Sequence, residues 1–202
     1  NGFVIGQGVG VVVLKRLAGA ERDGDRLLGV FGGWGVNQDG KTNGIPGPNE
    51  DSQARLLQSV YERFDIDPAG IQLIEAHGTG TKLGDPIELE ALATVFGEKT
   101  AKKNFCALGS VKTNIGHTSG AAGVAGVQKV LLSMRHRSLA PSLNLTTENS
   151  LFDFKGSPFY VWREQQGWSA PPGSLLRAGV SSFGFSGTNA HLVLEEYVAP
   201  VK

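Results

Sequence analysis

The chain has 202 residues, of which 40% are hydrophobic, and its 19 basic residues balance its 19 acidic ones. No block of like charge is longer than two or three residues, so electrostatics give no reason to expect a nucleic acid or a membrane surface as a partner. No apolar stretch approaches the ~20 residues of a membrane span, and the first residues lack the plan of a signal peptide, which together predict a cytoplasmic protein.

Cysteine use and the start of the chain narrow the possibilities further. The single cysteine, Cys106, excludes an internal disulfide and a zinc site built from several cysteines, and it fits a reducing compartment. The sequence begins without Met and enters an apolar run almost at once. We therefore expect that something precedes Asn1 and that the sequence is a fragment of a longer polypeptide.

The first predicted strand is the β-branched run at residues 8–14, which is bounded by glycines and is typical of a strand covered on both faces. Residues 27–36 are expected to pair with it through the charged turn at residues 21–25. A polar, glycine-punctuated loop at residues 37–44 follows and can line a cleft.

Apolar side chains at helical spacing predict a helix at residues 52–64, with Asn49 or Asp51 as its N-terminal cap. Residues 71–76 predict a strand whose end delivers His77.

A second helix is predicted to run from Pro86 to Gly97. Asp85 is the expected N-cap, Pro86 stands at the first helical position, and Glu88 has the spacing of a capping box.

The remainder alternates between strands and one long helix. A buried strand is predicted at 105–111, and an alanine- and glycine-rich helix at 118–136 is expected to be buried in the middle of the fold, because small side chains permit close approach. Short strands are predicted after it, at residues 158–161, 178–182 and 191–195. This alternation indicates a layered α/β architecture.

Two histidines, His77 and His117, stand in glycine- and hydroxyl-rich motifs after predicted strands, where α/β sheets place ligand-binding crevices. A histidine in such a turn is, taken alone, more often a hydrogen-bonded turn residue. His117 precedes the glycine-rich helix, whose dipole disfavours the charged imidazole. Two neutral imidazoles aimed at one thioester oxygen would form an oxyanion hole, which stabilises the enolate left when a β-carboxylate departs as carbon dioxide.

Three motifs, at residues 77–81, 112–117 and 184–191, resemble in order and spacing those of β-ketoacyl synthase domains from modular polyketide synthases, and residues 37–40 and 116–119 are similar to those of trans-acyltransferase systems. The likeness covers only the family's C-terminal half. It implies half of a thiolase-like (α-β-α-β-α) fold, with a mixed sheet and a buried glycine- and alanine-rich helix. Residues 1–202 would then be an incomplete ketosynthase domain without its nucleophile-bearing N-terminal half.

The resemblance implies that His77 and His117 bind the extender thioester and promote its decarboxylation. Lys112 would interact with Glu88 and order the site, because an unpaired buried lysine tends toward its neutral form. A surface lysine and a capping glutamate are the alternative.

The resemblance also implies a substrate-binding set. Thr79 and Thr81 would hydrogen-bond the phosphopantetheine arm of an acyl carrier protein, and Asn189 belongs to the same set. Phe183 and Phe185 are similar to the family's gatekeeping aromatics, and the Phe185 N–H would complete an oxyanion hole for the acyl thioester. Ordinary core phenylalanines are the alternative.

Several positions depart from the family pattern or lie outside the chemistry. Gln7 replaces a glutamate and Ser186 replaces a glycine. Cys106 cannot be the nucleophile, because an apolar strand keeps its thiol protonated. No residue of this chain is therefore assigned as nucleophile, and His136 and His191 are expected in packing or surface roles.

The leading hypothesis is a ketosynthase portion that catalyses decarboxylative Claisen condensation of an acyl thioester with malonyl-acyl carrier protein, once an N-terminal half supplies the cysteine. We expect a homodimer when complete, phosphopantetheine on the carrier protein, and no directly bound cofactor. A non-elongating acyl-transfer ketosynthase and a noncatalytic docking or structural half-domain remain open, and a half-domain should expose an apolar face. A metal site is disfavoured, because it lacks a third ligand and Asp85 and Glu88 have a simpler use at a helix start.

Overall fold

A computed structural model describes residues 2–40 and 47–199. The helices are α1 (Leu17–Asp23), α2 (Glu50–Arg63), the 3₁₀ turn η1 (Pro68–Gly70), α3 (Gly84–Gly97), α4 (Lys112–Ile115), η2 (Ser119–Ala121) and α5 (Ala122–His136). The strands are β1 (Val30–Gln38), β2 (Leu73–Glu75), β3 (Cys106–Gly109), β4 (Ser138–Leu139), β5 (Phe159–Tyr160), β6 (Gln166–Gly167), β7 (Arg177–Phe183) and β8 (Thr188–Glu195). Part of the polar loop predicted at 37–44 lies outside the described residues.

A six-stranded mixed sheet, in the order β1-β8-β7-β2-β3-β5, forms the centre of the fold. Strands β7, β2, β3 and β5 run parallel, whereas β8 pairs antiparallel with both β7 and β1. The carboxyl ends of β2 and β3 therefore meet at one edge of the sheet, and the segments that carry His77 and Lys112 leave from there. The predicted mixed α/β sheet is confirmed.

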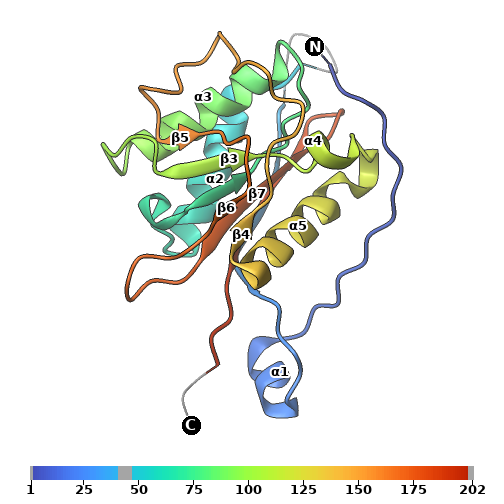
Figure 1. Ribbon diagram of the computed structural model, residues 1–202, viewed down its shortest axis with the longest axis vertical. Coiled ribbons are helices and arrows are strands. Elements are labelled where there is room, and N and C mark those ends of the chain that lie inside the picture. The colour runs from blue at the N-terminus through green and yellow to red at the C-terminus, as the bar shows by residue number, and fades with distance from the viewer. Residues whose placement is uncertain (1, 41–46, 200–202) are drawn as a thin grey trace.

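Helices cover both faces of this sheet, α2 and α3 on one side and α5 on the other (Figure 1). Strand side chains alternate between two apolar clusters: Ile74 packs toward α2 and α3, whereas Leu73 packs toward α5. Val193 and Leu194 divide in the same way. The period of two along each strand thus produces a three-layer α/β/α sandwich.

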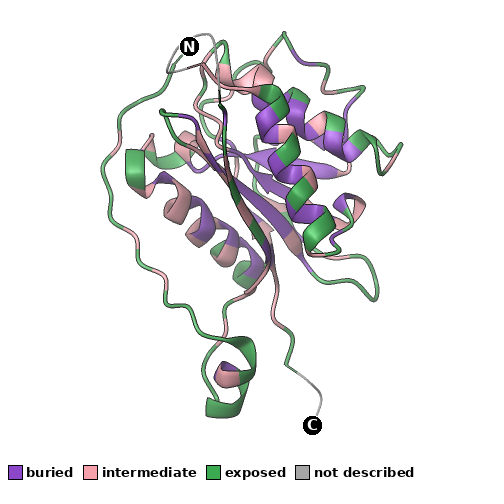
Figure 2. Ribbon diagram, turned by 180° about the vertical axis from the view of Figure 1, so that it is seen from behind, coloured by how far each residue is buried: buried purple, intermediate pink, exposed green. Residues whose placement is uncertain are grey.

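The strand predicted at residues 8–14 is not formed. This segment runs in extended form along the outside of the molecule, with Val9 95% and Val13 93% exposed (Figures 1 and 2). Its expected partner pairs instead with β8, from Val30↔Glu195 to Gln38↔Thr188. No strand among the described residues pairs with this run; its contacts with the fold are side-chain ones, in which Val12 packs against the cluster that faces α5 and the Gln128 amide donates to the Val11 carbonyl at 3.3 Å.

The N-terminal segment carries seven of the 19 exposed large hydrophobic side chains in the described residues. The exposed side chains of residues 3–14 are Phe3, Val4, Ile5, Val9, Val11, Val13 and Leu14. Helix α5 is likewise covered on one face only: Val127 and Val130 are buried, whereas Leu132 is 53% exposed. The glycine- and alanine-rich helix thus packs its buried face on the sheet and exposes part of the opposite face.

The N-terminal ends of α2 and α3 show which of the predicted helix caps are present. The Asn49 side chain caps α2 by accepting from the Ser52 N–H at 3.1 Å, as predicted. Helix α3 begins two residues before Pro86, and Asp85 is not its cap; the Asp85 carboxylate turns back to accept from the Gly80 N–H at 3.0 Å. The start of α3 is instead bound by Thr81, whose hydroxyl accepts from the Gly84 N–H.

Two small elements were not expected. The charged turn predicted at 21–25 contains the last turn of α1, which ends at Gly24 with φ +71°. Strands β4 and β6 form a separate antiparallel pair. None of the helices in residues 2–40 and 47–199 has the length and hydrophobicity that crossing a bilayer demands.

Candidate active site

The structure brings His77 and His117 together. His77 follows the end of β2, and His117 follows α4 and Gly116. Their ring centroids lie 5.6 Å apart, with the ring planes at 86°. Both residues are partly buried.

Backbone N–H groups fix the tautomer of each ring. The Phe183 N–H donates to His77 Nδ1 at 3.3 Å, and the Ser119 N–H donates to His117 Nδ1 at 3.1 Å. A nitrogen that accepts a hydrogen bond carries no proton, so the proton of each neutral ring lies on Nε2. Both imidazoles are thus prepared to donate an Nε2–H.

The surroundings also keep both rings neutral. Burial lowers the pKa of His77 to about 3, and the positive charge of Lys112 and the neighbouring His117 act in the same direction. Burial, followed by Lys112, lowers the pKa of His117 as well. The neutral state agrees with the sequence expectation, with burial as its largest cause at both rings.

Glu88 binds the backbone of the His77 loop and does not pair with a lysine. Its buried carboxylate accepts from the His77 N–H at 2.7 Å and from the Gly78 N–H at 2.9 Å. Gly78 adopts φ +48°, and a Cβ there would approach Ser110 Cβ to 2.9 Å, so glycine is needed in this turn. Burial raises the pKa of Glu88 to about 7 despite the two backbone donors.

The expected direct pairing of Lys112 with Glu88 is not present, since no ion pair joins them within 4.0 Å in the described chain. Lys112 is half-buried, and burial lowers its pKa, while the negative charges of Glu88 and then Glu75 oppose that shift. Lys112 therefore acts on the site through its charge at a distance.

The two threonines flank the same loop. Thr79 Oγ1 and Thr81 Oγ1 lie 3.2 Å apart, and both residues are half-buried. Since Thr81 also binds the start of α3, its hydroxyl is positioned by the fold before any ligand arrives.

The third motif places its residues in different surroundings. Phe183 lies beside His77, with ring centroids 5.5 Å apart, whereas the Phe185 side chain is 78% exposed. Asn189 is 1% exposed, and its amide donates to Asp39 Oδ1 at 2.6 Å and to Asn37 Oδ1 at 3.1 Å. Asn189 of β8 therefore links to Asn37 and Asp39 from within the fold.

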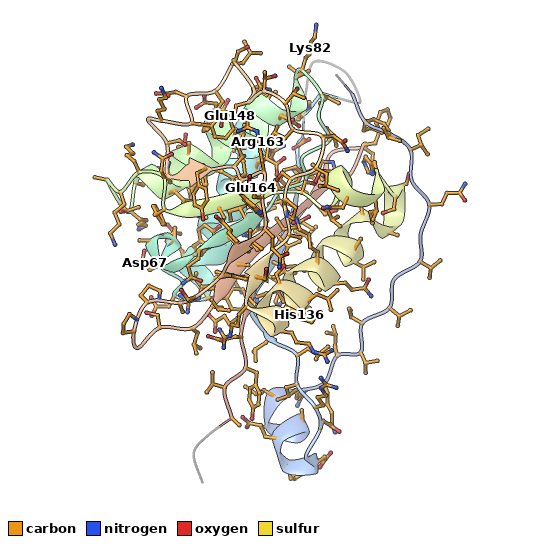
Figure 3. All side chains as sticks on the ribbon, in the orientation of Figure 1. Asp67, Lys82, His136, Glu148, Arg163 and Glu164 are labelled. Atoms are coloured by element: carbon orange, nitrogen blue, oxygen red, sulfur yellow. The ribbon has the colours of Figure 1, made fainter. Side chains whose placement is uncertain are left out.

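The other histidines and the cysteine lie away from this site. Cys106 is fully buried and burial raises its pKa, as expected of an unreactive thiol. His191 is buried between Tyr61 and Ser181. His136 lies exposed at the end of α5, far from Lys82, which follows the threonine loop (Figure 3). Across residues 2–40 and 47–199, no cluster of three or more His, Cys, Asp or Glu is arranged to hold a metal ion.

Sequence reasoning missed two features of the site. The N-terminal segment hydrogen-bonds both histidine loops: Gly2 N–H donates to Gly80 O, the His117 N–H donates to Val4 O, and Gly6 N–H donates to His117 O, at 2.8, 2.8 and 3.0 Å. Glu75 and Lys129 form a buried ion pair beneath the site. A glutamate inside an otherwise apolar strand was the available signal for the second feature.

Comparison with known proteins identifies the family. Residues 28–146 match the family described as β-ketoacyl synthase, C-terminal domain. The chain belongs to the β-ketoacyl synthase family. The resemblance stated from the three motifs is thereby confirmed.

Relatives of this ketosynthase chain include long polyketide synthases. It is 61% identical to polyketide synthase PksL of Bacillus subtilis, over 98% of this chain and 4% of that protein. It is 48% identical to polyketide synthase ThaG of Burkholderia thailandensis, again over 98% of this chain and 4% of that protein.

Solved ketosynthases have the same fold. The ketosynthase from module 6 of the bacillaene synthase of Bacillus subtilis superposes with a TM-score of 0.90 at 61% identity, over 91% of this chain and 33% of that one. Ketosynthase twelve of the bacillaene polyketide synthase of Bacillus amyloliquefaciens gives a TM-score of 0.87 at 44% identity, again over 91% and 33%. The chain thus spans about a third of the solved ketosynthases that it matches.

Proposed function

We propose that this chain supplies the decarboxylating part of a ketosynthase that elongates a polyketide by condensing an acyl thioester with a malonyl unit on an acyl carrier protein. The observation that carries the proposal is the geometry of His77 and His117. Their rings lie 5.6 Å apart, both are neutral, and both have Nδ1 occupied by a backbone donor. Both Nε2–H groups would then donate to one acceptor.

The proposed chemistry uses these donors during loss of carbon dioxide. When the bond between the malonyl carboxylate and the α-carbon breaks, its electron pair moves into the thioester carbonyl and forms an enolate. His77 and His117 would donate to the enolate oxygen, and each such donor typically contributes ~3 to 4 kcal/mol to the transition state. Neutral imidazoles suit this role because they donate without protonating and quenching the enolate.

The enolate carbon then attacks the carbonyl of an acyl group held as a thioester on a cysteine; the new C–C bond forms as the acyl C–S bond breaks and the cysteine leaves as thiolate. Cys106 is buried, and burial raises the pKa of its thiol, so it is not the acyl-carrying cysteine. We assign the acyl-carrying cysteine to a ketosynthase portion outside these 202 residues. The Phe185 N–H would bind the oxyanion of that acyl thioester. Thr79 and Thr81 would hold the phosphopantetheine arm of the carrier protein, the only cofactor involved. A homodimer of the completed domain and a cytoplasmic location remain predictions.

Decarboxylation of malonyl carrier protein tests the proposal. The chain is combined with the cysteine-bearing portion, and carbon dioxide release from carboxyl-labelled malonyl carrier protein is followed. We expect release by the wild type and a loss of about 100- to 1000-fold in either His77→Ala or His117→Ala. His136→Ala, an exposed histidine at the end of α5, is the matched control and should leave the rate unchanged.

The same assay separates the alternatives. A non-elongating acyl-transfer ketosynthase would load an acyl group on its cysteine but release no carbon dioxide. A docking module would do neither. Equal rates in the wild type and in both alanine variants would also refute the role given to the histidines.

A further inference from the structure

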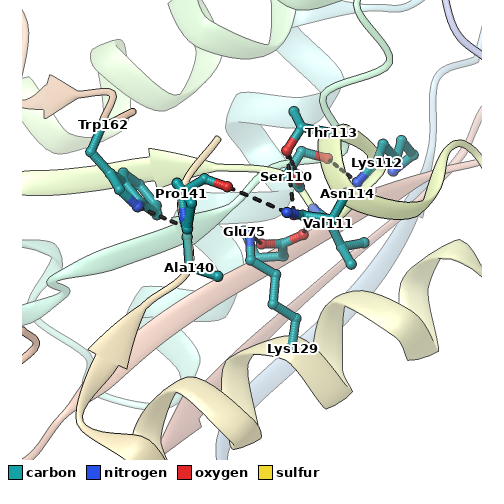
Figure 4. Close-up of polar contacts among 10 residues, drawn as sticks. All are labelled: Glu75, Ser110, Val111, Lys112, Thr113, Asn114, Lys129, Ala140, Pro141 and Trp162. Carbon is teal, nitrogen blue, oxygen red and sulfur yellow. Dashed lines mark hydrogen bonds and ion pairs between the residues drawn. The ribbon is translucent and has the colours of Figure 1, made fainter. Parts of the chain in front are cut away.

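A buried carboxylate, Glu75, joins the elements that carry the two histidines. It ends β2, two residues before His77, and its side chain is 2% exposed. One oxygen, Oε2, accepts from Lys129 Nζ of α5 at 2.7 Å. The other, Oε1, accepts from the N–H of Val111, which begins the turn into α4 (Figure 4).

The space for this pair is built by glycines and an aromatic ring. A Cβ at Gly126 would approach Glu75 Cγ to 3.1 Å, so this position of α5 must be small for the carboxylate to fit. A Cβ at Gly109 would meet Trp162 Cη2 at 2.7 Å and Lys129 Nζ at 3.4 Å. The Lys129 ammonium lies 6.0 Å from the centre of the Trp162 ring, within the range of a cation–π interaction.

The rest of the turn is fixed around the same point. The Thr113 hydroxyl donates to the Ser110 carbonyl at 2.9 Å, and the Asn114 amide donates to the Pro141 carbonyl at 3.4 Å. Trp162 is held in turn by its Nε1–H, which donates to the Ala140 carbonyl at 2.8 Å. These bonds fix side chains around the turn. Only the Glu75 carboxylate links the first N–H of the turn, that of Val111, to β2 (Figure 4).

We propose that Glu75 and Lys129 are a positioning pair for the two-histidine site. Lys129 pairs with Glu75 and orients its carboxylate, and Glu75 holds the Val111 N–H so that α4 leaves β3 at the angle that brings His117 to His77. The proposal rests on the proposed function for its catalytic consequence, but not for its geometry. Neither member touches the proposed substrate, so both act through the histidines.

The charges of Glu75 and Lys129 also affect the pKa of Lys112. Burial lowers the pKa of Lys112, Glu88 and then Glu75 oppose that shift, and Lys129 adds to it. Lys112 in turn helps to lower the pKa of both histidines. Altering one member of the pair therefore changes the field at the imidazoles as well as the backbone that carries them.

Histidine ¹⁵N resonances of the full 202-residue chain test the geometry directly, because they report the tautomer of each ring. Glu75→Gln and Lys129→Met are expected to move the His117 Nδ1 and Nε2 resonances away from those of a pure Nε2–H tautomer. Lys129→Arg, which keeps the positive charge, should stay closer to the wild type. Arg177→Met is the control, since it breaks the Arg177–Glu195 ion pair at the opposite end of β7 and should leave both rings unchanged.

The pair would be refuted as a positioning device if folded Glu75→Gln and Lys129→Met gave histidine resonances identical to those of the wild type. If Lys129→Met does not fold, the comparison of Glu75→Gln with Lys129→Arg decides the question alone. In the completed ketosynthase, both uncharged variants should lower kcat for carbon dioxide release by about 10- to 100-fold with KM for malonyl carrier protein unchanged. A wild type that releases no carbon dioxide would refute the proposed function, whereas the resonances would still decide the role of the pair.

Discussion

The neutral state of His77 predicts a measurable dependence of stability on pH. Burial places its pKa at about 3 in the folded chain, against an ordinary value of 6.5. Because the folded pKa is the lower of the two, its contribution is fully present above the unfolded pKa and is lost as the pH falls toward the folded pKa. Between pH 7 and pH 5 the unfolded chain gains about 0.7 of a proton at this histidine, which lowers the free energy of unfolding by about 2 kcal/mol.

His77→Asn isolates this contribution. The Asn Oδ1 replaces the His Nδ1 as acceptor for the Phe183 N–H, but the side chain does not titrate in this range. The free energy of unfolding is measured by urea denaturation at pH 7 and pH 5 for both proteins. The wild type should lose about 2 kcal/mol more than His77→Asn. Parallel losses would show that His77 is not held neutral, and the oxyanion-hole argument would lose its basis.

Three further outcomes follow from buried groups. Asn189→Ala should lower the free energy of unfolding by about 1 to 3 kcal/mol, because the buried Asp39 carboxylate loses its amide donor; an unchanged urea midpoint would contradict this. Cys106 should resist alkylation by iodoacetamide in the folded chain and react only when the chain is unfolded in urea; rapid labelling under native conditions would make the thiol a candidate nucleophile after all. Phe96→Ala should cost about 3 to 5 kcal/mol in the same urea titration, since Phe96 is fully buried between α2 and the sheet; a cost below 1 kcal/mol would show that the core collapses around the gap.

The sequence pattern correctly predicted those helices and strands whose formation depends mainly on residues close together in the chain. The apolar spacing at residues 52–64 gave α2 with its Asn49 cap, and the apolar run at 71–76 gave β2. The run at residues 8–14 has an equally strong local pattern but forms no strand, because a strand also needs a neighbour to pair with and no strand of the described residues pairs with this run. Where a pattern requires a non-local neighbour, periodicity alone cannot supply the answer.

The candidate site shows the same division. The motifs identified His77 and His117, and the structure places them 5.6 Å apart. The tautomer of His77 depends on Phe183, which is 106 residues away and could not be paired with it from spacing. Glu88 was expected to meet a lysine, but a carboxylate satisfies two backbone N–H groups equally well, and no sequence signal distinguishes these uses.

Residues 2–6 form backbone hydrogen bonds with the loops of both histidines. Gly2 binds the loop of His77 through Gly80, and Val4 and Gly6 bracket His117 from both sides. The two histidine loops are therefore tied by backbone hydrogen bonds to the same short segment. Displacement of residues 2–6 would remove backbone hydrogen bonds from the loops of both histidines at the same time.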